Sequence, residues 1–339
     1  MEIDSTERRA RVGPRMRSGS QARVGTLPGK RQPRRISLYY VHIWLMAAPF
    51  LLGLTLLVIA PVLLAAPLAF SSYDALSPPE PVGWANFEEM GKDELFWNGL
   101  RASLILVVFA VPLRVASTFF LALLLQGRRR FFSLFRGAVY LPTVIPIVAY
   151  GMLWLYIFNP LYGPLNGLSQ LFSSDPSLVA NDVARGNTPG LWLIDPRATH
   201  AGIILLLLFT VGEGFVLLLA ALREIPHDLY EAAAIDGASY GRQTRHITLP
   251  LLAPSLLLLS LRDTVYCLQA SFALALVVTK GGPYYATTYL PYYIYLNGNE
   301  YLRFGYSAAM SWVLYGASAV IIALQFWLMR RWKGLDNAV

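Results

Sequence analysis

The stretch IWLMAAPFLLGLTLLVIAPVLLAAPLAF, residues 43–70, decides the fold class of this chain, because its 28 positions hold no charged residue. A helix that crosses about 30 Å of hydrocarbon needs about 20 predominantly apolar residues. The stretch follows a 42-residue polar lead and therefore lies too far along the chain for a cleaved signal peptide. We expect it to stay in the mature protein as a membrane-spanning helix.

Five further apolar stretches follow along the chain. Together with the first they predict six spans, at residues 43–70, 98–125, 137–158, 200–222, 252–279 and 305–329. The chain of 339 residues is 55% hydrophobic and 14% charged, whereas a soluble domain is about a quarter charged. The sequence therefore predicts an all-α membrane protein, a bundle of six transmembrane helices.

The 28 Lys and Arg residues are distributed unevenly between the two sides of this bundle. Ten lie in residues 1–42, four after the second span, three after the fourth and three after the sixth. Six are counted on the opposite side, with Arg101 at the start of the second span among them, and Arg114 and Arg262 fall deeper inside spans. Because cytoplasmic segments are enriched in Lys and Arg, both termini are predicted to be cytoplasmic. The net charge of +8 then reflects topology, and nucleic-acid binding is not expected.

The chain divides by composition into a tail, a membrane domain and a short end. Residues 1–42 are rich in Arg, Gly, Pro and Ser and predict a disordered cytoplasmic arm held near anionic lipid. Residues 43–329 form the transmembrane domain, which includes a cytoplasmic loop at 223–250. Residues 330–339 form a second cytoplasmic tail.

Signatures of catalysis and of cofactor binding are missing from the sequence. The single cysteine excludes an internal disulfide, and the four histidines are scattered without metal-ligand spacing. The segment from Gly25 to Arg31 looks like a phosphate loop. It has three residues instead of four between its glycines and no Ser or Thr after Lys30. We expect no enzyme activity, metal or cofactor in this chain.

The loop between the fourth and fifth spans contains IPHDLYEAAAIDGA, residues 225–238, followed by ITLP at 247–250. Pro226 suits the first turn of a helix, and Gly237 is placed to end that helix. We therefore expect a short helix, a sharp turn and a second helix that runs to Pro250. Small residues at helical spacing give the first helix a narrow ridge that allows close approach by another protein, formed by Leu229, Ala232, Ala233 and Asp236.

This loop resembles the EAA loop of permease subunits of binding-protein-dependent ABC importers. That pattern is Glu-Ala-Ala, three residues, Gly, nine residues and Ile-x-Leu-Pro, and it is matched in register by Glu231, Ala232, Ala233, Gly237, Ile247, Leu249 and Pro250. The aromatic residues that many carbohydrate permeases have in the second helix are replaced here by Gly241 and Thr244.

The resemblance implies the type I ABC importer permease fold of the MetI-like kind, in a bacterial or archaeal cell membrane. It implies that the residues of this loop, with Asp236, dock on an ATPase subunit as a coupling helix. It further implies a second permease chain, two ATPase subunits that bind ATP and Mg²⁺, and an extracytoplasmic binding protein that delivers the solute.

Three further segments resemble the carbohydrate branch of these permeases. They are VGWANF at 82–87 followed by FWN at 96–98, FNPLYGPLN at 158–166, and TKGGP at 279–283 followed by Thr287 and GYSAA at 305–309. The resemblance extends over about residues 40–335 and implies a sugar or oligosaccharide as substrate. Glycerol phosphate, a polyamine, an amino acid or a peptide stay open as alternatives. A secondary transporter would show internal repeats or broken helices, which the sequence does not reveal.

Polar residues inside the spans are candidates for the substrate pathway, because polar groups in a bilayer usually face a bundle interior or a water-filled path. Arg262, Tyr266 and Gln269 share one stripe of the fifth span, with Phe272 beside them. The alternative is that Arg262 pairs with Asp263 and supports packing. Two further candidates are Glu213, which faces either the pathway or another subunit, and Tyr150, which lies on a face that also suits packing or interfacial anchoring.

Residues 284–306 hold eight of the 19 tyrosines. Amphipathic rings concentrate at the level of the lipid headgroups, so the segment predicts an aromatic belt. The alternative is a docking surface for the external binding protein.

Overall fold

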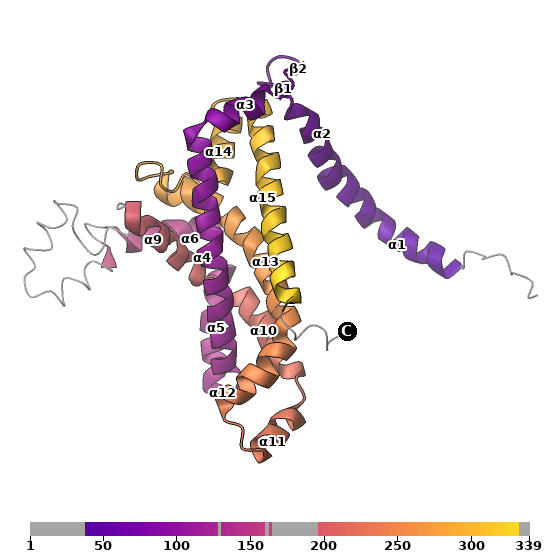
Figure 1. Ribbon diagram of the computed structural model, residues 1–339, viewed down its shortest axis with the longest axis vertical. Helices are drawn as coiled ribbons and strands as arrows, with labels where there is room; N and C mark the ends of the chain where they lie inside the picture. Colours follow the sequence, from indigo (N-terminus) through magenta and orange to yellow (C-terminus); the bar gives the residue numbers. More distant parts are fainter. Residues whose placement is uncertain (1–37, 128–129, 160–162, 165–195, 332–339) are drawn as a thin grey trace, which may run out of the picture. The chain divides into compact units, whose positions relative to one another are not determined.

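The computed structural model describes residues 38–127, 130–159, 163–164 and 196–331. In chain order its α-helices (α), π-helical segments (η) and short strands (β) are α1 (Leu38–Leu54), η1 (Thr55–Ile59), α2 (Ala60–Leu68), β1 (Ser71–Ser72), β2 (Glu80–Pro81), α3 (Ala85–Lys92), α4 (Glu94–Leu125), α5 (Arg130–Val144), α6 (Ile147–Ile157), α9 (Pro196–Leu208), α10 (Gly212–Glu224), α11 (His227–Ile235), α12 (Tyr240–Gln243), η2 (Thr244–Thr248), α13 (Leu249–Leu274), η3 (Ala275–Thr279), α14 (Leu290–Tyr295), η4 (Leu296–Glu300) and α15 (Phe304–Arg330) (Figure 1).

Several predicted features lie wholly or partly outside the described residues. The arm predicted at 1–42 is described only from residue 38, so the segment from Gly25 to Arg31 is not included. The same holds for most of the segment 158–166 and for residues 332–339 of the C-terminal tail.

The chain divides into two compact units between Leu56 and Leu57. The described part of the first unit is α1 with the start of η1, and its side chains are mostly exposed. Residues His42–Leu68 form a helical stretch that is long and apolar enough to cross a membrane. This stretch agrees with the first predicted span.

Three long helices organise the second unit. Glu94–Leu125, Tyr240–Thr279 and Phe304–Arg330 each have the length and apolar character of a membrane span. The central helix α13 packs against both α4 and α15 (Figure 1). At the N-terminal end of α4, the Asp93 carboxylate accepts bonds from the amides of Leu95 and Phe96 and caps the helix.

The predicted third and fourth spans, at 137–158 and 200–222, are each broken into two helices. Helices α5 and α6 meet at a bend of 103°, and helices α9 and α10 at a bend of 51°. The first break follows from Pro146, because the residue before a proline disfavours helical backbone. With each bent pair taken as one span, the structure has six candidate spans in its described residues.

Three apolar clusters hold the second unit together. One joins α4, α6, α9, α13 and α14, and it includes the fully buried side chains of Leu106, Ile203 and Leu274. A second lies around Phe96 and Tyr306, and a third joins α4, α10 and α13. The third cluster lies on the two helices that lead into and out of the 223–250 loop, so it fixes the base of that loop.

Candidate functional site

The loop between α10 and α13 folds as a helical hairpin. Helix α11 begins at His227, with Pro226 in the N-cap position, one residue before the position expected from the sequence. Gly237 has a φ of +75°, which favours glycine, and it ends the helix as predicted. The amide of Ala238 donates to the carbonyl of Ala233 at 2.9 Å, and the Gly237 amide donates to that of Ala234 at 3.0 Å. These two bonds form a Schellman cap.

The second helix of the hairpin does not end at Pro250, which corrects that expectation. Residues Tyr240–Thr279 form one continuous helix, so the hairpin is continuous with the fifth span. Pro250 lies inside this continuous helix, directly after the π-helical segment η2 and Leu249, and does not end it. Ile247, Leu249 and Pro250 are half-buried at this junction.

Side-chain contacts hold the hairpin against the helix ends. The hydroxyls of Tyr230 and Thr248 lie 2.9 Å apart, which ties α11 to η2. The Gln126 amide donates to the Tyr240 hydroxyl at 3.2 Å and ties the end of α4 to α12. A cavity of about 790 Å³ lies between these contacts and the end of α10. The hairpin is therefore attached at three helix ends while most of α11 is exposed.

The residues matched to the EAA pattern on α11 lie largely on the surface. Glu231, Ala232 and Asp236 are exposed, and Ala233 is half-buried. The Glu231 carboxylate lies 3.0 Å from the ring of His227. Ile235, which the sequence analysis did not single out, is 86% exposed. Helix α11 therefore presents apolar and acidic groups together.

The polar stripe on the fifth span is divided between buried and exposed positions. Gln269 is exposed, whereas Tyr266 and Phe272 are half-buried. The Tyr266 hydroxyl donates to Thr210 at 3.1 Å, and the ring of Phe272 lies 5.2 Å from that of Tyr295. The stripe thus contacts the break in span 4.

Arg262 and Glu213 form an ion pair between α13 and α10. Arg262 also contacts Asp263 at 3.3 Å, so the pairing of these neighbours that the sequence analysis weighed is present. Both Arg262 and Glu213 remain partly exposed. The third polar candidate, Tyr150, is buried and donates to the carbonyl of Leu206 at 2.6 Å.

Arg114 is a buried residue whose importance the sequence analysis missed. Its guanidinium pairs with Asp263 and donates to Thr210, at the break between α9 and α10. The available signal was a charge in the middle of a predicted span, because such charges usually have partners and a role. Its partners were not predictable because Thr210 and Asp263 lie far from it in sequence.

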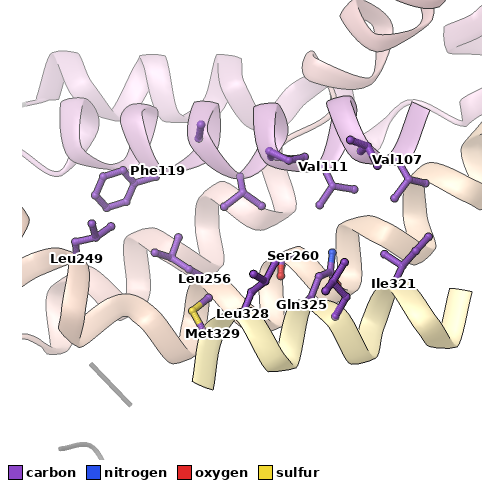
Figure 2. A pocket seen from close by; sticks show the side chains of 15 residues that line it. Val107, Val111, Phe119, Leu249, Leu256, Ser260, Ile321, Gln325, Leu328 and Met329 are labelled. Atoms are coloured by element: carbon purple, nitrogen blue, oxygen red, sulfur yellow. The ribbon is translucent and has the colours of Figure 1, made fainter. Parts of the chain in front are cut away.

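An apolar groove of about 580 Å³ runs between α4, α13 and α15. Figure 2 shows Val107, Val111 and Phe119 on one side, with Ile321 and Leu328 opposite. None of the six predicted pathway residues lines it. Sugar hydroxyls that are buried need hydrogen-bond partners, so this groove does not suit a sugar.

The tyrosine-rich segment joins a polar cluster at the Asp93 end of α4. The Asp93 carboxylate accepts bonds from the hydroxyls of Tyr293 and Tyr306, both at 2.7 Å. Burial opposes ionisation of Asp93, but the two tyrosines and the capped amides together hold its pKa below 3.8. Burial, with the bond to Asp93, raises the pKa of Tyr293 to about 12. Glu89 and Arg303 form an ion pair beside this cluster, at 2.5 Å.

Within residues 38–127, 130–159, 163–164 and 196–331, no group of three His, Cys, Asp or Glu side chains is placed to hold a metal ion.

Comparison with known proteins places this architecture in a family. The family model for the binding-protein-dependent transport system inner membrane component matches residues 118–334. The sulfoquinovosyl glycerol transport system permease protein SmoG of Agrobacterium fabrum is 30% identical over 84% of this chain and 89% of that protein. The lactose transport system permease protein LacF of Rhizobium radiobacter is 30% identical over 87% of this chain and 96% of that protein.

A solved structure shares the fold. One chain of a bacterial ABC transporter involved in the import of the acidic polysaccharide alginate superposes with a TM-score of 0.72. The two are 20% identical over 87% of this chain and 96% of that chain. Since the family model covers most of this chain and two relatives match nearly their full length, the chain belongs to the family of inner membrane components of binding-protein-dependent transport systems and is a permease subunit of an ABC importer rather than an enzyme.

Proposed function

We propose that this permease imports a sugar or oligosaccharide that an extracytoplasmic binding protein delivers. In this proposal it pairs with a second permease chain in a bacterial or archaeal cell membrane. Two ATPase subunits bind ATP and Mg²⁺, and one of them docks on the cytoplasmic hairpin of this chain. The observation that carries the proposal is the exposed, small-residue ridge of α11 at the end of two membrane helices.

The coupling role rests on how α11 is attached. It follows α10 directly, and the helix after its turn continues into α13. The bond between Tyr230 and Thr248 links the two arms of the hairpin. A push on the ridge is therefore carried into spans 4 and 5 together. ATP binding on the partner subunits biases the equilibrium between outward and inward access.

The sugar assignment rests on the relatives and on the charges near the stripe. The printed names of SmoG and LacF specify sulfoquinovosyl glycerol and lactose. The charge of Arg262 is neutralised by Glu213 and Asp263, which favours an uncharged ligand beside Tyr266. Gln269 and Phe272 add an amide and an aromatic face, the groups that bind a sugar ring, and Tyr150 lies behind the stripe.

A phosphorylated substrate is the second candidate. The sn-glycerol-3-phosphate transport system permease protein UgpA of Agrobacterium fabrum is 31% identical over 72% of this chain. Equilibrium binding of lactose and of glycerol 3-phosphate to the partner binding protein separates the two candidates. Binding of glycerol 3-phosphate alone contradicts the sugar assignment.

The coupling role is tested by placing the same bulky residue on opposite faces of α11. Ala232 and Ala234 are both exposed, and about 200° of helical turn separates them. Ala232→Leu fills the ridge and is expected to abolish both ATPase binding and transport. Ala234→Leu is the matched control and is expected to retain both. Glu231→Ala is expected to reduce the ATPase activity of the assembled complex. Full activity and assembly of Ala232→Leu and Glu231→Ala refute the docking role.

A further inference from the structure

A buried arginine holds the break in span 4. Arg114 of α4 is 0% exposed. Its Nη1 donates to the carbonyl of Leu207 and, at 2.9 Å, to the hydroxyl of Thr210, while Nη2 donates to the Thr210 carbonyl at 3.1 Å. The last carbonyls of a helix have no partner within it. At this break the Leu207 carbonyl also accepts from the amide and the hydroxyl of Thr210, so the guanidinium reinforces the bonded break and adds a bond to the Thr210 carbonyl.

The same guanidinium is joined to the fifth span. Its Nε lies 3.2 Å from Oδ2 of Asp263, whose side chain is 1% exposed. One arginine thus connects spans 2, 4 and 5. Lysine has a single charged centre and cannot reach two carbonyls, a hydroxyl and a carboxylate in this fork geometry.

This cluster is costly to maintain unless its geometry has a use. Replacing a buried ion pair by apolar residues of similar volume is often neutral or stabilising. Packing alone would therefore be served as well by two apolar side chains at positions 114 and 263. What apolar side chains would not supply is bonding to the backbone at a helix break.

The break lies between the coupling hairpin and the outer part of span 4. Helix α10 runs from the break to α11, and α13 is continuous with the second arm of the hairpin. A displacement of the hairpin therefore arrives at residues 209–211. Without a restraint there, bending at the break would absorb the displacement.

We propose that Arg114 and Asp263 are positioning residues that clamp the break in span 4, so that α9 and α10 move as one body when the coupling hairpin moves. This inference rests on the proposed coupling role. Thr210 is part of the clamp, because its hydroxyl receives bonds from Arg114 and from Tyr266. Movement of the hairpin is thereby linked to the stripe assigned to the substrate.

The test measures the distance across the break in the complete importer complex in lipid nanodiscs. Spin labels are placed at Ala201 of α9 and Val216 of α10, which are both exposed. Distances are recorded without nucleotide and after trapping with ATP and vanadate. In the otherwise unchanged chain we expect the same distance in both states. In Arg114→Met/Asp263→Leu we expect the distance to shift and broaden on trapping.

Thr210→Val provides a second variant that adds no unpaired charge, in case the double variant does not assemble. Thr264→Val is its matched control, because Thr264 is also a buried threonine but bonds to Ser260 and Gln325 outside the clamp. We expect Thr210→Val to shift the trapped distance and Thr264→Val to leave it unchanged.

Each result decides the inference. A distance that stays constant in every assembled variant overturns the clamp, as does a distance that already shifts in the unchanged chain. ATP hydrolysis and ATPase binding by the unchanged complex are measured in the same samples. Failure of those two readouts counts against the coupling role itself, and the clamp falls with it.

Discussion

Replacement of Asp93 by Asn is expected to loosen the polar cluster that joins α4, α14 and α15. The carboxylate accepts four hydrogen bonds, two from capped amides and two from the hydroxyls of Tyr293 and Tyr306. Asn is also a good N-cap, so the amide bonds survive the change. Both tyrosine hydroxyls donate to Oδ2, and the Nδ2 that takes its place in Asn is a donor. The two charge-assisted bonds, both 2.7 Å long, are therefore lost and give way to neutral bonds that the hydroxyls accept.

The magnitude follows from those two bonds. A hydrogen bond to a charged group contributes about 1.5–3 kcal/mol, against about 1 kcal/mol for a neutral pair. The difference, taken over two bonds at a half-buried site, gives a loss of about 2 kcal/mol. A loss of that size corresponds to about a 30-fold change in an equilibrium constant.

Amide hydrogen exchange measures this loss locally, without requiring reversible unfolding of the whole membrane protein. We expect the amides of residues 85–97 to exchange about 30-fold faster in Asp93→Asn, if they open through loss of this cluster. Asp74→Asn is the matched control, because that carboxylate bonds only within its own turn, to Leu76 and Ser77. Exchange within twofold of the unchanged protein in Asp93→Asn would refute the assigned role.

Three further outcomes follow from the structure. Gly305→Ala places a Cβ 2.0 Å from the carbonyl oxygen of Ser71, so overpacking is expected to lower stability by about 3 kcal/mol, measured by thermal melting. Gly237→Ala meets no atom within 4 Å, so only its φ of +75° opposes the change; we expect a loss of about 1 kcal/mol and retained ATPase binding. Because the folded pKa of Asp93 lies below 3.8, its contribution to stability is present above pH 3.8 and is lost as the pH falls through the folded pKa. Because the folded pKa of Tyr293 is raised to about 12, its contribution to stability is present below pH 10 and is lost as the pH rises toward 12. Exchange of residues 85–97 at both pH extremes checks the last point, with Asp93→Asn insensitive at the acidic end.

Local patterns made the coupling hairpin predictable. A helix end at Gly237 depends on backbone conformation and on bonds to residues three to five positions away, so the sequence around it holds the necessary information. The helix after it was predicted to end at Pro250, but the helix continues past this proline, which closely follows the π-helical segment η2. Whether the helix continues past Pro250 depends on the position of this proline within the helix, which residue type alone does not specify.

The breaks in spans 3 and 4 show the opposite case. Pro146 is a visible local signal for the bend after α5, yet an apolar window that spans both halves hides it. The bend after α9 has no proline between Leu208 and Gly212. Its carbonyls accept additional bonds from Arg114, which lies 93 positions away from Leu207 in sequence. A single sequence therefore shows the charge but not the helix end that it serves.

Charged residues inside the spans fall into two kinds, partly exposed and buried, which hydropathy does not distinguish. Arg262 and Glu213 are partly exposed and pair with each other, so they remain available to a pathway that opens beside them. Arg114 and Asp263 are buried and pair with each other, and Arg114 also bonds to the backbone at a helix break. The bilayer penalises an unpaired charge in either place, but only the second pair also supplies hydrogen bonds that the broken helix lacks. We therefore expect substitutions at Arg262 and Glu213 to change which solute is transported, and substitutions at Arg114 and Asp263 to change how span 4 moves.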